Sequence, residues 1–216
     1  MTTIAEEVLL LAHSEEEGRQ LVGSTELDAA LGGSLLAELA LNGRIDLDGK
    51  KVAVLNSAPL GNEELDAALA RISADPKERK PDWWVGKLHS GGLRKRLLSA
   101  LAERGVLGEE RRKILGIFPS TRYPELDPSV EREVRERVES VLAGAVPDER
   151  VAVLIAVLHA AKIDRKAFPG VSKERVKEIV EGNWAGDAVA RTIAAVNAAV
   201  MAGVIAGAVA ATAGSG

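Results

Sequence analysis

The hydrophobic positions of this chain recur mostly at the three- and four-residue spacing of amphipathic helices. Segments 4–12, 63–72, 128–142 and 172–182 each carry one apolar stripe with polar residues between, and 150–161 is apolar almost throughout. Such stripes have to be buried against one another. We therefore expect a mostly α protein. It should form a single compact helical domain, residues 1–216, around a core helix bundle with two short β-hairpins.

Two of these segments carry detailed signals. Leu65, Leu69 and Ile72 fall on one face of the helix expected at 63–72. Asp127-Pro128 is a typical N-cap and first-turn pair for the helix that follows. That helix presents one valine stripe: Val130, Val134, Val138 and Val141. Acidic pairs such as Glu6-Glu7 lie in first turns, where carboxylates favour the helix dipole.

Segment 24–43 is also helical in pattern, with Ser24 or Thr25 as N-cap and Gly43 as the C-terminal stop. It contains two adjacent glycines, Gly32 and Gly33. Because glycine weakens a helix interior, we expect this pair to bend or split the helix.

Alternating apolar residues on both sides of Asp48-Gly49 predict a first hairpin. The stretch "LLAELALNGRIDLDGKKVAV" then aligns without gaps with "LLSALAERGVLGEERRKILG", 62 residues later. Gly43 falls on Gly105 in this internal repeat, which predicts a second hairpin after Gly105. The repeat places the apolar cluster Ile114, Leu115, Ile117 and Phe118 in the second strand of that hairpin.

The last apolar segment, Thr192 to Ala213, has 22 residues without a charge. That length could span a bilayer. Most of its residues are alanine and glycine, however, and Asn197 interrupts it. We interpret it as a central core helix, with a membrane span as the alternative.

Charge is distributed unevenly along the chain. The net charge is -4, yet the stretch from Lys87 to Arg122 has nine Lys or Arg against three Glu, a charge of +6 that leaves -10 elsewhere. A cationic face on an acidic body can hold an anionic partner in one orientation. Acidic residues at the N-terminus, where a signal peptide would carry cations, and the lack of cysteine predict a cytoplasmic protein.

Signs of catalysis are few. His13, His89 and His159 are far apart in the sequence, and no nucleotide-binding glycine motif is present. "HSGG" at residues 89–92 lacks the residues that surround a nucleophilic serine. We expect no enzyme activity, no cofactor and no metal site.

The stretch "RRKILGIFPSTRYPE" combines Arg111, Arg112 and Lys113 with the apolar cluster. Apolar side chains can enter the headgroup region of a bilayer while neighbouring cations bind anionic lipid. A helix followed by a hairpin is also the layout of a winged-helix DNA-binding domain. Phosphates attract cations but not leucine or phenylalanine, so we expect no nucleic-acid partner.

Several motifs resemble the Golgi phosphoprotein 3 family, also called GPP34. They are "EEVLLLAH", "GGSLLAELALNGRIDL", "SAPLGNEELDAAL", "KLHSGGLRKRLLSALAERGVL" and "ILGIFPSTRYP". They occur in the family's order and cover roughly Ile4 to Val204. The Ala-rich form resembles the bacterial branch. The resemblance implies a helical, cytosolic protein that phosphatidylinositol 4-phosphate recruits to membranes, with the hairpin at Ile114 to Phe118 used in membrane contact and self-association.

The family's lipid pocket matches only in part. Of its two arginines before the "GVL" turn, Arg94 matches one, and Gly91 lies at or beside the other. Gly23 and Gly32 stand where eukaryotic members have a tryptophan and an arginine. We expect Arg94, at the junction of a polar loop and a helix, to be exposed, and Arg94 and Arg96 to bind an anionic headgroup together with the cations of the hairpin.

The sequence thus predicts a peripheral membrane protein that binds anionic phospholipid. The alternative is a protein-interaction module in which Ile114 to Phe118 buries in a partner or in a second copy of the chain.

Overall fold

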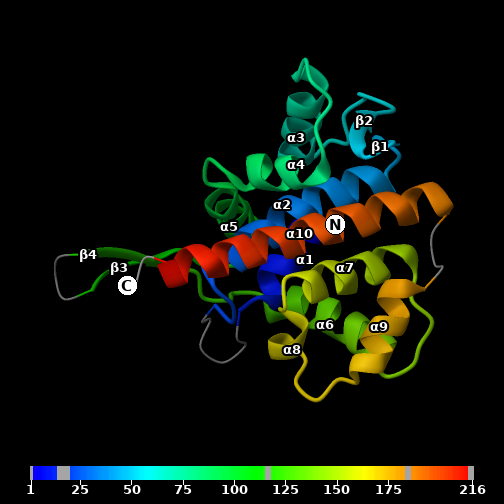
Figure 1. Cartoon of the computed structure of the whole chain (residues 1–216). Helices are drawn as coiled ribbons and strands as arrows, with labels where there is room; N and C mark the ends of the chain where they lie inside the picture. The colour runs from blue at the N-terminus through cyan, green and yellow to red at the C-terminus, as the bar shows by residue number, and fades with distance from the viewer. Residues whose placement is uncertain (1, 14–19, 115–117, 183–185, 214–216) are drawn as a thin grey trace.

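The computed structural model describes residues 2–13, 20–114, 118–182 and 186–213; for 111–114, 118–122 and 211–213 it describes the backbone alone. Helices predominate, with two antiparallel hairpins in this part of the chain (Figure 1). The helices are α1 (Ile4–Leu11), α2 (Ser24–Leu41), α3 (Glu63–Ala74), α4 (Pro81–His89), α5 (Leu93–Glu103), α6 (Pro128–Leu142), α7 (Glu149–Ala160), α8 (Asp164–Ala167), α9 (Lys173–Glu181) and α10 (Asp187–Ala213). The strands are β1 (Ile45–Asp48), β2 (Lys51–Val54), β3 (Glu110–Ile114) and β4 (Phe118–Arg122). The predicted mostly α fold with two hairpins is confirmed.

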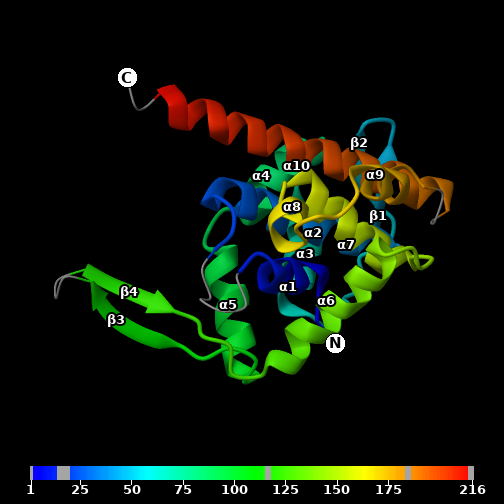
Figure 2. The same ribbon diagram turned by 90° about the horizontal axis from the view of Figure 1, so that it is seen from below.

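The core is centred on α2, which packs against α1, α4, α7 and α10 (Figures 1 and 2). Almost every residue of α2 from Leu27 to Ala40 is buried. The helix α7 is also apolar on all sides, because α2, α9 and α10 pack around it. The predicted faces of α3 and α6 also lie in this core, with Leu65, Leu69 and Ile72 buried on α3.

The two glycines of α2 do not split it, since α2 runs unbroken from Ser24 to Leu41. They let neighbouring helices come close instead. A Cβ on Gly32 would lie 2.5 Å from the carbonyl oxygen of Val85 on α4. A Cβ on Gly33 would overlap the Val200 side chain of α10. Both glycines therefore serve close helix packing rather than a break in the helix.

The core-helix interpretation of α10 holds for only part of its length. Ile193, Val196 and Val200 are buried, and Thr192 donates a hydrogen bond to Asp46 of β1 at 2.6 Å. Towards the C-terminal end, Met201, Ile205 and Val209 are 44%, 60% and 62% exposed, because the helix continues past the edge of the body.

By length and composition, one helix of the described residues could cross a membrane. It is the segment Asp187–Ala210, and 33% of its apolar stretch of 18 residues is buried within the protein.

The first hairpin forms as predicted around Asp48-Gly49. Asp48 is opposite Lys51, and Gly49 has a φ of +61°, a left-handed conformation that glycine adopts without strain. Ile45 and Val52 are buried and attach the hairpin to the core.

Buried ion pairs join α1 to helices distant in sequence. Glu7 is 1% exposed and lies 3.0 Å from Arg137 of α6 and 3.5 Å from Arg150 of α7. Arg150 also binds Glu38 of α2 at 2.6 Å and donates to the Thr2 carbonyl. Burial raises the pKa of the Glu7 carboxyl, and the two guanidinium groups oppose this shift. Glu7 therefore does more than favour the dipole of α1.

Candidate membrane-binding face

The second hairpin is fixed to the body at its foot. After α5, Gly105 turns the chain with a φ of +74°, and Val106 and Leu107 are buried. The Gly108 amide donates to the Pro124 carbonyl at 2.7 Å, and Leu107 forms an isolated bridge with Glu125. Beyond this foot, the β3–β4 ribbon projects away from the helices (Figures 1 and 2).

The apolar cluster spans the end of this hairpin. Ile114 ends β3 opposite Phe118, the first residue of β4, while Leu115 and Ile117 lie outside the described residues. The expectation that the whole cluster lies in the second strand is therefore wrong. The internal repeat failed here because the chain after Gly105 bonds to residues 124–127 and forms the foot, so the first strand begins only at Glu110.

The three cations that precede the cluster are on β3. Arg111, Arg112 and Lys113 are opposite Thr121, Ser120 and Pro119. Their backbone is therefore on the projecting ribbon, within a few residues of its end.

Arg94 is held on the body rather than exposed. It follows Gly91 and Gly92, both in the left-handed region, in the first turn of α5. Its guanidinium donates to Asp28 at 3.0 Å, to Gln20 at 2.8 Å and to Ser24 at 3.2 Å, and its side chain is 26% exposed. The expectation of an exposed Arg94 is wrong, because α2 supplies a carboxylate and a hydroxyl that the sequence separates from it by more than sixty residues.

Arg96 is likewise paired. It binds both carboxylate oxygens of Glu64 on α3 and donates to the Gly91 carbonyl at 2.6 Å. The hydrogen bonds to Glu64 raise the pKa of Arg96, against a smaller opposing effect of burial. A phosphate that bound either arginine of α5 would have to share it with a carboxylate of the protein.

His13 lies close enough to Arg94 to be affected by its charge, a proximity that the sequence did not predict. Its Nδ1 is 2.7 Å from the Leu9 carbonyl oxygen. Burial lowers the pKa of His13, and the positive charge of Arg94 lowers it further. The only sequence signal for His13 is its position directly after the apolar segment 4–12, and a single histidine there is a weak signal.

Replacing Arg94 with alanine should lower the free energy of unfolding by about 1–3 kcal/mol, since Asp28 loses a charged hydrogen-bond partner. Thermal denaturation would measure this effect, with Lys95→Ala as the control, because Lys95 is the exposed neighbour on the same helix. The pKa of His13, followed by NMR titration, should rise in Arg94→Ala. Equal stability of the two variants would contradict the anchoring role of Arg94.

The described residues contain no group of three or more His, Cys, Asp or Glu that could hold a metal ion. Gly32, which stands at a pocket position of the family, is buried against α4 and is not available to a ligand.

Comparison with known proteins gives a relative and a family. Vacuolar protein sorting-associated protein 74 of Eremothecium gossypii is 28% identical over 164 residues, which are 65% of this chain and 49% of that protein. The chain thus matches about half the length of this relative. The relative is fungal, so the comparison does not support the bacterial-type assignment. A family model described as Golgi phosphoprotein 3 (GPP34) matches residues 4–196, and the chain therefore belongs to this family.

Proposed function

We propose that this protein is a peripheral membrane protein that binds anionic phospholipid through the β3–β4 hairpin. The observation that carries the proposal is the apolar end of a ribbon that projects from the body, with Ile114 opposite Phe118 and three cations just before them. Membership of a family of non-enzymatic Golgi sorting proteins agrees with the prediction that the chain is not an enzyme.

The energetics of such a contact are those of reversible attachment. Each apolar side chain that enters the bilayer contributes roughly 1.5–3 kcal/mol. Each of Arg111, Arg112 and Lys113 adds about 1 kcal/mol on an anionic surface. The buried foot at Val106 and Leu107 supports this role, because a fixed hairpin loses less conformational entropy on binding than a free loop.

The headgroup is proposed from the family, which is known for binding phosphatidylinositol 4-phosphate at the Golgi. Arg94 and Arg96 would then form the body side of the lipid site, with Asp28 and Glu64 as competitors for the phosphate. We infer modest headgroup selectivity, and a cytoplasmic protein that associates peripherally with such membranes.

The test is co-sedimentation with vesicles. The double variant Leu115→Ser with Phe118→Ser should lose most of its binding to vesicles of equal parts phosphatidylcholine and phosphatidylserine, while its melting temperature stays nearly unchanged. Exchanging phosphatidylserine for phosphatidylinositol 4-phosphate would measure selectivity. Leu55→Ser is the control, since Leu55 is an apolar residue that is 65% exposed beyond the first hairpin. Unchanged vesicle binding by the double variant, or a large fall in its melting temperature, would falsify the proposal.

Self-association through the same hairpin is the second candidate. Within the described residues, β3 and β4 pair only with each other, so both outer edges of the ribbon can accept another strand. Analytical ultracentrifugation of the same double variant tests it: a smaller assembly without any change in vesicle binding would favour this function.

A further inference from the structure

The last turns of α10 carry an apolar stripe with exposed side chains. Met201, Ile205 and Val209 are spaced by four residues, which places them on one face of the helix. The opposite face still packs on α2, since Val204 is buried and a Cβ on Gly207 would overlap Thr25. The exposed stripe therefore lies on a helix that the core holds in place.

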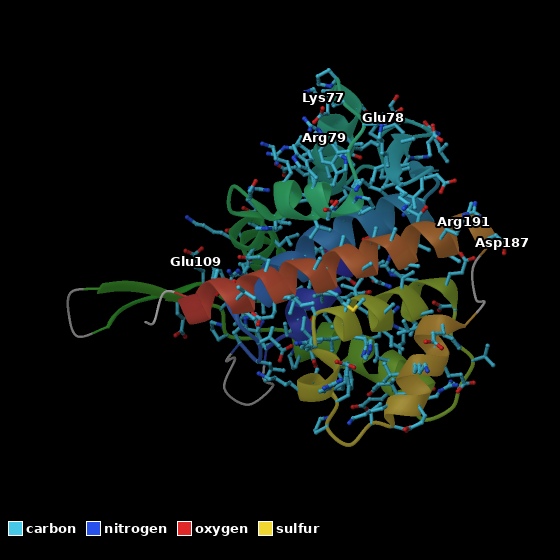
Figure 3. The ribbon with its side chains drawn as sticks, viewed as in Figure 1. Lys77, Glu78, Arg79, Glu109, Asp187 and Arg191 are labelled. Carbon is cyan, nitrogen blue, oxygen red and sulfur yellow. The ribbon has the colours of Figure 1, made fainter. Side chains whose placement is uncertain are left out.

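This part of α10 also differs from the usual exposed helix in its charge. An exposed face normally carries charged residues, which keep the helix soluble. The charged residues of α10 are Asp187 and Arg191, and both lie in its first turns, at the end far from the hairpin (Figure 3). The last turns contain only apolar residues, glycine, alanine and threonine.

The free end of α10 and the second hairpin project from the same side of the body. Both lie at the left in the two perpendicular views, and Figure 2 shows them well apart from each other. Next to the hairpin, on the body, is α5, where Lys95 is exposed (Figure 2). This side therefore has two separate projections that carry apolar residues, the end of the hairpin and the last turns of α10, together with cations on β3 and α5. An anionic bilayer complements that arrangement, with phosphates for the cations and an apolar interior for the projections.

We propose that the last turns of α10, from Met201 to Ala213, are a second membrane contact, which enters the boundary between headgroups and acyl chains while the hairpin enters beside it. This inference rests on the proposed function. The occupant is a bilayer rather than a second copy of this chain, because the stripe is small. Three partly exposed side chains offer far less than the roughly 800 Å² that each partner buries in a stable dimer.

The test compares two matched double variants. Ile205→Ser with Val209→Ser changes the stripe, and Leu55→Ser with Val146→Ser changes two apolar residues outside it that are more exposed, at 65% and 91%. On vesicles of equal parts phosphatidylcholine and phosphatidylserine, the first should bind at least about tenfold more weakly than the parent protein, and the second should bind as the parent does.

The outcomes separate this inference from the proposed function. If the parent protein binds these vesicles and the stripe variant binds equally well, the second contact is wrong while the hairpin stands. A stripe variant that changes only the oligomeric state would identify a second copy as the occupant and overturn the inference. A parent protein that does not bind the vesicles would overturn both.

A direct measurement avoids any effect on folding. The chain has no cysteine, so Val209→Cys can carry one environment-sensitive fluorophore, with Val146→Cys as the control. The fluorophore at position 209 should shift to the blue on vesicles and be quenched by spin-labelled lipid, and the one at position 146 should not. Equal spectra with and without vesicles at position 209 would contradict the inference.

Discussion

Arg150→Ala is expected to lower the free energy of unfolding by about 3–5 kcal/mol, enough to unfold much of a marginally stable domain. The substitution removes the positive charge that lies between Glu7 and Glu38, whose side chains are 2% and 7% exposed. In the variant, Glu7 still forms its ion pair with Arg137, and Glu38 still accepts the hydrogen bond from the Ile4 amide. Each buried carboxylate therefore loses only part of the interactions that stabilise its charge. A buried charge without its partner is costly because water cannot replace the lost interaction.

The defect of Arg150→Ala should shrink as the pH falls. Burial already raises the pKa of Glu7 above its ordinary value of 4.5, and removal of the Arg150 charge raises it further. Between the ordinary value and the raised pKa, folded Glu7 is protonated while unfolded Glu7 is ionised. The folded state binds the extra proton, so its stability rises as the pH decreases through this window.

Urea denaturation at neutral pH and at about pH 5 would measure both effects. Lys51→Ala is the matched control, because Lys51 and Glu78 form an exposed ion pair at 3.2 Å, and such pairs contribute only about 0–1 kcal/mol. If Arg150→Ala were no more destabilising than Lys51→Ala, the buried ion pairs would not be a main support of the fold.

Gly32→Ala is expected to destabilise the protein by about 1–3 kcal/mol, although alanine is the better helix former. Its new methyl carbon would lie 2.5 Å from the Val85 carbonyl oxygen, which belongs to the backbone of α4 and cannot rotate away. Either α4 or α2 must move, and the core between them loses contact.

Gly86→Ala should have the opposite sign. Gly86 lies inside α4 and is exposed, and a Cβ at this position would meet no other atom within 4 Å, so alanine should stabilise the helix by about 0.5–1 kcal/mol. Gly33→Ala should fall between these two, since its neighbour is a methyl group of Val200 rather than backbone. Thermal denaturation of the three variants gives their order. A stabilised Gly32→Ala would show that α2 and α4 do not need this close approach.

These glycines show which structural features the sequence could predict and which it could not. Local signals were sufficient for the first hairpin, because Asp48-Gly49 determines a turn by its own geometry. The role of Gly32 depends on Val85, which lies on another helix and leaves no trace beside Gly32 in the sequence. From the sequence alone, a glycine inside a helix predicts a local weakening of the helix, and its packing role is known only once its neighbours in space are known.

The same limit applied to the candidate site. Charge predicted the cationic stretch and the internal repeat predicted the hairpin, but neither predicted that Asp28 and Glu64 bind the two arginines of α5. Nor could composition tell that α10 is a core helix in one half and an exposed projection in the other, since alanine and glycine suit either environment. Those properties depend on which residues meet in three dimensions.

The packing of α2 against α10 also sets the order in which this protein can fold. The two helices are separated by more than 140 residues of chain, and α10 covers the face of α2 that contains Gly33. During synthesis on the ribosome, α2 leaves the exit tunnel long before its partner exists. The protein must therefore complete its core late, after α10 emerges, and until then the uncovered face of α2 is open to chaperones and to aggregation.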